Sequence, residues 1–326
     1  MAFEIPIGLF IFKRDKVVQI IDRLREIKPL KLYILADYGR NTEEIELAKH
    51  CREVVEKNID WDCEVIKNYA EENRGVYANI GLGASWVLER EKWAIFLEDD
   101  NLPEISFFQY CEEMLKRYEN EEKVLWICGT NYLGKYNSPD GASYMFTRHL
   151  LPCGWASWSK KFLKYYSGEL KQCVDINNIK STKKRYIFRR LYIQYKNLWM
   201  GEYRKIARGE RPRSWDYQMD FTLKYYDLLG ISPAYNQIKN IGVDELSEHG
   251  GNSFTLEMTR RFCGMNSYSL DFPLKHPEKV AINNDYEKKI GKILLYPLQI
   301  RLKLYVLIVL KKIMGIPEDK SLRKRR

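Results

Sequence analysis

The chain has 326 residues, of which 45% are hydrophobic and 30% charged, so its composition excludes a fibrous or wholly disordered protein. Its formal net charge of +10 is uneven, because residues 288–326 carry 12 Lys/Arg against two acids and residues 170–213 carry 13 against three. Two basic segments are thus attached to an acidic remainder, which disfavours a protein that is basic throughout, such as a general nucleic-acid binder.

The first hundred residues alternate between strand and helix patterns. Short apolar runs indicate buried strands, and each is followed by a segment with apolar residues at helical spacing. This βαβαβαβ order predicts an α/β fold with a mainly parallel sheet, helices on both faces and a ligand site at the C-terminal ends of the strands. The expected strands are Ile5–Phe12, Lys31–Ala36, Cys63–Asn68 and Trp93–Leu97, and the expected helices are Lys16–Glu26, Thr42–Glu56 and Tyr77–Arg90.

The rest of the chain is less regular. A helix is expected over Phe107–Tyr118, and strands over Lys123–Gly129, Tyr144–Phe146 and Ile231–Pro233, which would make the sheet mixed. We predict one α/β domain over residues 1–255, which includes a basic, aromatic helical insertion at 170–213. A connecting segment at 256–287 and a basic amphipathic tail at 288–326 would follow.

Three adjacent carboxylates, Glu98, Asp99 and Asp100, directly follow the apolar strand Trp93–Leu97. Crowded carboxylates repel one another, and hard cations such as Mg²⁺ or Mn²⁺ bind one or two carboxylates together with substrate phosphates. The pattern therefore favours a metal-assisted phosphate site. The alternative interpretation is a solvated acidic loop, and other strand-end carboxylate enzymes, such as phosphatases and polymerases, share the pattern.

A second signal lies more than a hundred residues later, in Ser214-Trp215-Asp216-Tyr217-Gln218. Trp215 can exclude water from Asp216, and a carboxylate with a raised pKa is a suitable general base for a hydroxyl group. Asp216 is also a plausible helix N-cap, because Met219, Leu223 and Tyr226 continue a helical face. Both interpretations can hold together.

Two further segments have weaker signals. His249 precedes two glycines, which suits a loop that reaches a diphosphate or a metal, although a loop histidine is more often a surface residue. In Gly154-Trp155-Ala156-Ser157-Trp158, small residues separate two tryptophans whose rings can form the walls of a sugar or base site. A packed aromatic core is an equally good interpretation of that segment.

Taken in order, these motifs resemble those of bacterial GT-A-fold glycosyltransferases related to the N-acetylglucosaminyltransferase I family. The resemblance covers about residues 4–255, and its specificity comes from the order of the motifs, since any one of them would be weak. The motifs are Phe12–Asp15, Asp37, Asn73-Arg74-Gly75, Glu98-Asp99-Asp100, Gly154–Trp158, Ser214–Gln218 and Asn240-Ile241-Gly242 with His249.

The resemblance implies an inverting transferase that uses a nucleotide-diphosphate sugar, with a uridine nucleotide as the first candidate. Asp100 would coordinate Mn²⁺ or Mg²⁺ on the diphosphate, Asp99 would contact the ribose and Glu98 the donor sugar, and Asp216 would be the catalytic base. The other residues implied for the nucleotide-sugar site are Arg14, Asp37, Asn73, Arg74, Trp155, Trp215 and His249.

The basic segments suggest a membrane partner. The region Ile293–Ile316 is apolar but interrupted by Pro297 and several Lys/Arg, so it suits a helix lying on anionic lipid better than a spanning helix. The run Arg323–Arg326 would add to this attraction. A helix packed on the core with a solvated tail is the alternative. We expect an acceptor that is a glycan, in particular a lipid-linked glycan, and a location in the cytoplasm at the inner face of the cell membrane.

Three other functions compete with this one. Aromatic residues interleaved with Lys/Arg in 170–213 would also suit a nucleic-acid-binding protein, although we expect no nucleic-acid partner because the basic residues form two separate segments. A retaining transferase on the same fold and a catalytically silent sugar-binding module are the others.

Overall fold

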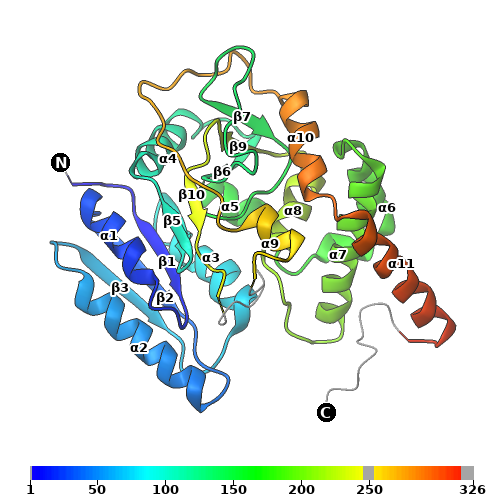
Figure 1. The fold of residues 1–326 in the computed structure, drawn as a ribbon, viewed down its shortest axis with the longest axis horizontal. Helices are drawn as coiled ribbons and strands as arrows, with labels where there is room; N and C mark the ends of the chain where they lie inside the picture. The colour runs from blue at the N-terminus through cyan, green and yellow to red at the C-terminus, as the bar shows by residue number, and fades with distance from the viewer. Residues whose placement is uncertain (1, 245–252, 317–326) are drawn as a thin grey trace.

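The computed structural model describes residues 2–244 and 253–316 (Figure 1). Within them the central sheet has eight strands in the order β3-β2-β1-β4-β8-β6-β9-β7, and a second sheet pairs β10 with β5. The strands are β1 (Ile7–Ile11), β2 (Lys31–Ala36), β3 (Glu64–Tyr69), β4 (Trp93–Glu98), β5 (Asn101–Pro103), β6 (Val124–Cys128), β7 (Tyr144–Thr147), β8 (Trp155–Trp158), β9 (Leu229–Pro233) and β10 (Ile238–Asn240).

The first four strands of the chain form a parallel block in which β1 lies between β2 and β4, and β3 pairs with β2. Ile11 is opposite Ala36, and Phe10 is opposite Glu98, so these strands end at the same edge. The remaining strands add antiparallel pairs, because β8 runs against β4 and β6, and β7 against β9. The predicted α/β class, with a mixed and mainly parallel sheet, is confirmed.

Helices cover both faces of the sheet, as predicted, because alternate residues of the buried strands point to opposite sides. One apolar cluster joins the strands to α1, α2 and α4, and the other joins them to α3, α5, α7, α8 and α10. These helices are α1 (Val17–Ile27), α2 (Thr42–Asn58), α3 (Gly83–Leu88), α4 (Ile105–Arg117), α5 (Ser159–Tyr165), α7 (Arg189–Ala207), α8 (Asp216–Tyr225) and α10 (Asn284–Leu294). A π-helical turn, η1 (Tyr77–Leu82), precedes α3.

Strand β8 was not expected from the sequence. It lies between β4 and β6, with Ala156 opposite both Ile95 and Ile127. Its four residues are too few to show an alternating pattern, and Gly154 before it has a left-handed φ of 59°, where an added Cβ would lie 2.5 Å from Ile238. Gly154 therefore leaves room for the Ile238 side chain.

The insertion is helical, as expected. It contains η2 (Lys171–Val174), α6 (Ile176–Ser181), η3 (Thr182–Arg185) and α7, and Leu191 and Trp199 of α7 are fully buried. After β10 the chain forms α9 (Glu257–Phe262), α10 and α11 (Leu298–Ile313). Tyr286 and Ile290 of α10 are fully buried, whereas α11 has no buried residue.

Among the described helices, none is by itself long and apolar enough to pass as a bilayer span. Helices α10 and α11 pass that test of length and composition only together, and a 59° bend separates them.

Candidate active site

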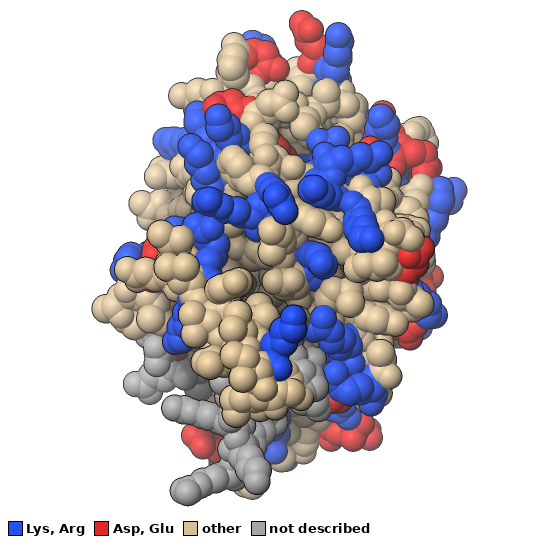
Figure 2. Space-filling view, turned by 90° about the vertical axis from the view of Figure 1, so that its right-hand side faces the viewer, with Lys and Arg blue, Asp and Glu red and all other residues tan. Residues whose placement is uncertain are grey.

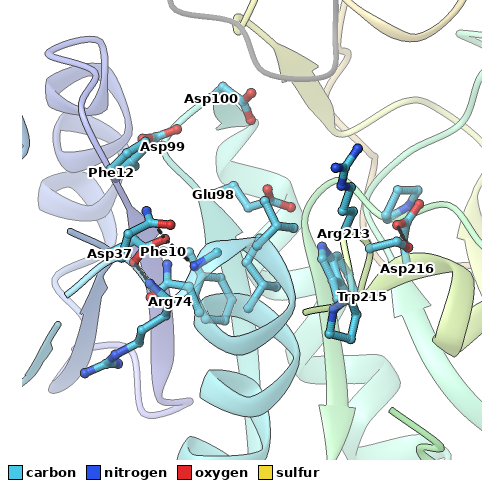
Figure 3. Close-up of a pocket in the computed structure, with 18 of the residues that line it drawn as sticks. Phe10, Phe12, Asp37, Arg74, Glu98, Asp99, Asp100, Arg213, Trp215 and Asp216 are labelled. Carbon is cyan, nitrogen blue, oxygen red and sulfur yellow. Dashed lines mark hydrogen bonds between the residues drawn. The ribbon is translucent and has the colours of Figure 1, made fainter. Parts of the chain in front are cut away.

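A cleft of about 1080 Å³ opens at the edge where the parallel strands end (Figure 3). It is lined by residues from β1, the acidic loop after β4, the loop after β3, the end of the insertion and the start of α8. Nine of the residues expected at a site from the sequence line this one cleft, namely Arg14, Asp37, Asn73, Arg74, Glu98, Asp99, Asp100, Trp215 and Asp216. His249 lies outside the described residues.

Asp99 is held by the end of β1. Its carboxylate accepts a hydrogen bond from the Phe12 backbone N–H at 3.0 Å and one from the Arg14 guanidinium at 3.0 Å. The same Arg14 nitrogen lies 3.1 Å from Asp100. A cationic side chain thus bridges the two aspartates from the side of β1, as the parallel pairing of β1 with β4 allows.

Asp100 is fixed from the opposite side by the C-terminal half of the chain. Its side chain accepts a 2.6 Å hydrogen bond from the Asn101 amide, and its backbone carbonyl accepts one from the Ile241 N–H at 2.8 Å. Asn101 and Asn240 are paired in the small β5–β10 sheet. Gly242 lies so close that an added Cβ would be 2.2 Å from the Asp100 carboxylate. The loop after β10 therefore holds Asp100 in place.

Burial raises the pKa values of all three acids in this loop. Burial raises the pKa of Asp99 to about 6 although Arg14 opposes the shift, and burial is also the main cause of the raised pKa of Asp100. The pKa of Glu98 is raised well above its usual value by burial and by the charges of Asp100, Asp99 and Asp216. The loop therefore has more negative charge than Arg14 neutralises, which is the electrostatic condition for capturing a cation.

Asp37 organises the loop that follows β3. Its two side-chain oxygens accept hydrogen bonds from the backbone N–H groups of Arg74 at 2.7 Å and Gly75 at 3.0 Å, and from the Asn73 amide at 3.2 Å. Gly75 has a φ of 77°, which a side chain would disfavour. Asp37 and Asn73 are thus adjacent, and Asp37 shapes this loop; the nucleotide contact of both residues stays a prediction.

Asp216 is the first residue of α8 and lies across the cleft from Glu98 (Figure 3). The Ser214 hydroxyl donates to the Asp216 carboxylate at 2.7 Å and accepts from the Tyr217 N–H at 2.9 Å. The N-cap interpretation of Asp216 is therefore wrong, because Ser214 supplies the capping oxygen. Trp215 is buried beside Asp216, as expected.

Trp155 differs from its expected position. It is only 1% exposed and does not line the cleft, because β8 inserts its ring between those of Phe96 and Trp126, each with a centroid 4.2 Å away. Trp215 stacks on the same ring at 5.6 Å. Trp155 therefore supports the floor of the site from below, and the packed-core interpretation is the correct one for this residue.

The end of the insertion, which the sequence assigns to the acceptor or membrane side, forms one side of the cleft, with Arg211 and Arg213 as lining residues that were not expected. Glu202 of α7 accepts a 2.7 Å hydrogen bond from the Arg213 backbone N–H, so the segment after α7 folds back on the helix. Arg211 then donates to the Asn73 carbonyl at 2.6 Å and closes the cleft over the β3 loop. In the sequence, the one sign that Arg211 and Arg213 line the cleft is that they lie only a few residues before the Trp215 motif.

The described residues contain no group of three His, Cys, Asp or Glu side chains that could hold a metal ion. The loop nevertheless offers the hard oxygens of Asp100 and an excess of negative charge. Such a site fits Mn²⁺ or Mg²⁺ that takes most of its ligands from a bound diphosphate and from water.

No protein-family model and no curated protein matched this sequence. Among solved structures, a UDP-glucose pyrophosphorylase complexed with UDP-glucose is similar, with a TM-score of 0.36 and 8% identity over 72% of this chain and 93% of that one. A 4-diphosphocytidyl-2C-methyl-D-erythritol synthase from Anaerococcus prevotii has a TM-score of 0.33 and 9% identity over 73% and 93%. These scores are too low for the likeness to say anything about activity or ligands.

Proposed function

We propose that the protein is an inverting, metal-dependent glycosyltransferase that uses a nucleotide-diphosphate sugar, with a UDP-sugar as the first candidate. The observation that carries the proposal is the pairing, across one cleft, of the acidic loop at Glu98–Asp100 with the single carboxylate of Asp216. The acidic loop would bind the charged donor with its cation, and Asp216 would act on the acceptor.

Asp100 would hold Mn²⁺ or Mg²⁺, which when bound neutralises charge on the diphosphate as a Lewis acid. Asp99 and the β3 loop shaped by Asp37 border the part of the cleft assigned to the nucleoside, and Glu98 borders the part assigned to the sugar. Arg14 limits the repulsion between Asp99 and Asp100, because its guanidinium contacts both.

Asp216 would remove the proton of an acceptor hydroxyl as its oxygen bonds to the anomeric carbon. The bond from that carbon to the diphosphate oxygen breaks on the opposite face, so the configuration inverts and the nucleoside diphosphate leaves. The Ser214 hydroxyl orients the Asp216 carboxylate through its 2.7 Å hydrogen bond. Water is excluded on one side by the buried ring of Trp215.

The acceptor side of the cleft is bordered by the insertion, where Lys205, Arg211 and Arg213 lie among the lining residues. We propose a glycan acceptor, and a lipid-linked one in particular, because these cations can contact the phosphate of a lipid carrier. Arg213 lies between Glu98 and Asp216 in the view of Figure 3, and we assign it to acceptor contact within this proposal.

The test is a thermal-shift panel of nucleotide sugars with and without Mn²⁺, followed by an assay of nucleoside diphosphate release and of the product anomer. We expect one nucleotide to stabilise the protein only with metal present, and Asp100→Asn to abolish that effect. Asp216→Asn should keep the metal-dependent binding while lowering the transfer rate about 10²–10⁴-fold. Retention of anomeric configuration, or unchanged transfer by the Asp216 variant, would refute the proposal.

A further inference from the structure

We propose that the face formed by α6, η3, α7 and α11 is a docking surface for an anionic lipid bilayer. The inference does not depend on the proposed function, because it starts from the surface of helix α11 and not from the cleft. A helix of a water-soluble protein normally turns its apolar stripe toward the core and its polar side outward. Helix α11 instead leaves its apolar stripe exposed and has no buried residue.

The outward side of α11 is a continuous apolar stripe. At 3.6 residues per turn, its six positions fall within an arc of about 100°, and no charged residue lies inside that arc. Two of them are among the most exposed apolar side chains of the protein, Tyr305 at 67% and Ile313 at 76%. The stripe consists of Leu298, Leu302, Tyr305, Val306, Val309 and Ile313.

The stripe is held in a fixed place on the fold. Gln194 of α7 donates to the Leu294 carbonyl at 3.0 Å and accepts from the Tyr296 N–H at 2.9 Å, so it ties down the link between α10 and α11. The Arg301 guanidinium then donates to the Tyr296 carbonyl at 2.9 Å. Helix α10 is packed in the core, so α11 is the one of these two helices whose apolar side chains are exposed and can contact a lipid phase.

Cations surround the stripe. Residues 176–201 contain seven Lys/Arg and no acid, and α11 adds four more and no acid. Figure 2 shows this face with blue side chains spread between uncharged ones and with the red acidic side chains gathered toward its margins. Exposed apolar residues such as Val174 and Ile193 lie in the same insertion. An apolar stripe bordered by cations matches the apolar interior and anionic headgroups of a bilayer surface.

A second copy of the chain is the less suitable occupant. Stripe-to-stripe pairing would bring two cation-rich faces together, because residues 176–201 and α11 carry no acid, and like charges across an interface oppose association. A lipid surface supplies the opposite charge and buries the stripe at once. Contact with one lipid surface also accounts for both the basic insertion and the basic helix α11.

The test is flotation of the full chain with vesicles of phosphatidylcholine, with and without phosphatidylglycerol, at physiological ionic strength. We expect binding to the anionic vesicles only. The stripe variant Leu302→Gln/Val306→Gln/Ile313→Gln should fold normally, because all three side chains are exposed, and should lose about tenfold or more in affinity. The matched control Lys49→Gln/Lys57→Gln, on the distant helix α2, should bind like the unchanged protein.

A second variant separates charge from apolar contact. Replacing Lys183, Lys184, Arg189 and Arg190 with Gln should weaken binding by about tenfold or more and flatten its salt dependence. Equal binding to neutral and anionic vesicles, or unaltered binding by the stripe variant, would overturn the proposal. So would a dimer that the stripe variant converts to a monomer, or a preference for single-stranded RNA over the vesicles.

Discussion

Arg14 offers the sharpest test of the electrostatics of the cleft. Its guanidinium lies 3.0 Å from Asp99 and 3.1 Å from Asp100, and the three side chains are only 13%, 8% and 17% exposed. Arg14→Gln keeps polarity but leaves the two carboxylates without their shared cation. Breaking a fully buried ion pair costs about 3–5 kcal/mol, and the partial solvent access of the cleft reduces our expectation to about 2–3 kcal/mol.

For a chain of 326 residues that loss corresponds to a fall in Tm of about 3–4 °C, measurable by circular dichroism or dye fluorescence at about pH 8. The fall should shrink toward about pH 5, because the raised pKa of Asp99, about 6, means that this carboxyl binds a proton in the folded state before it does in the unfolded one. Once protonated, Asp99 no longer needs the cation.

Added Mn²⁺ should stabilise the Arg14→Gln variant more than the unchanged protein, because the ion replaces the missing positive charge. Arg23→Gln is the matched control, since its 3.0 Å ion pair with Glu26 is exposed and should contribute about 0.5 kcal/mol or less. If Arg14→Gln leaves Tm unchanged at about pH 8, or lowers it equally at both pH values, the reasoning is refuted.

Three other changes test neighbouring parts of the site. Gly242→Ala should displace the Asp100 carboxylate, because the added Cβ would lie 2.2 Å from it. Mn²⁺-dependent nucleotide binding should then weaken about 10–100-fold in a titration. The control Gly201→Ala, whose added Cβ meets nothing within 4 Å, should leave binding unchanged. Trp155→Ala should lower the free energy of unfolding by about 3–5 kcal/mol in a denaturant titration, because it removes the centre of a buried ring stack; a small change would contradict its supporting position. Glu98→Gln should raise the Tm of the free protein at neutral pH, because burial raises the pKa of Glu98 and its ionised form costs stability there. The gain should fade at acidic pH, where Glu98 of the unchanged protein is protonated. A gain independent of pH would refute this cause.

The parallel half of the fold could be predicted because β1, β2 and β4 contain apolar runs, such as residues 32–36 of β2, and periodic helices separate the strands. Strand β8 could not, since four residues following a glycine in a left-handed conformation have no period of their own and depend on the strands on either side. The same strand decided the position of Trp155, because the sequence does not distinguish a ring that lines a cleft from one that lies beneath it.

Residues that line the cleft could be predicted from the sequence where they directly follow a strand, as Asp100 does, or stand in a short motif, as Asp216 does. Both line one cleft. Arg211 and Arg213 were missed because they reach the cleft only when the segment after α7 folds back on Glu202, a contact that no local pattern records. The loop-shaping hydrogen bonds of Asp37 were missed for the same reason.

The pairing of β5 with β10 has a consequence for biosynthesis. Asn101 and its partner Asn240 are separated by roughly 140 residues, which a ribosome adds in about 7–28 s. During that interval the nascent chain already carries the acidic loop but lacks the segment that fixes Asp100. The cleft therefore cannot take its final form until Asn240 has been added, and a polypeptide released before that point would expose an unfinished acidic loop to solvent and metal ions.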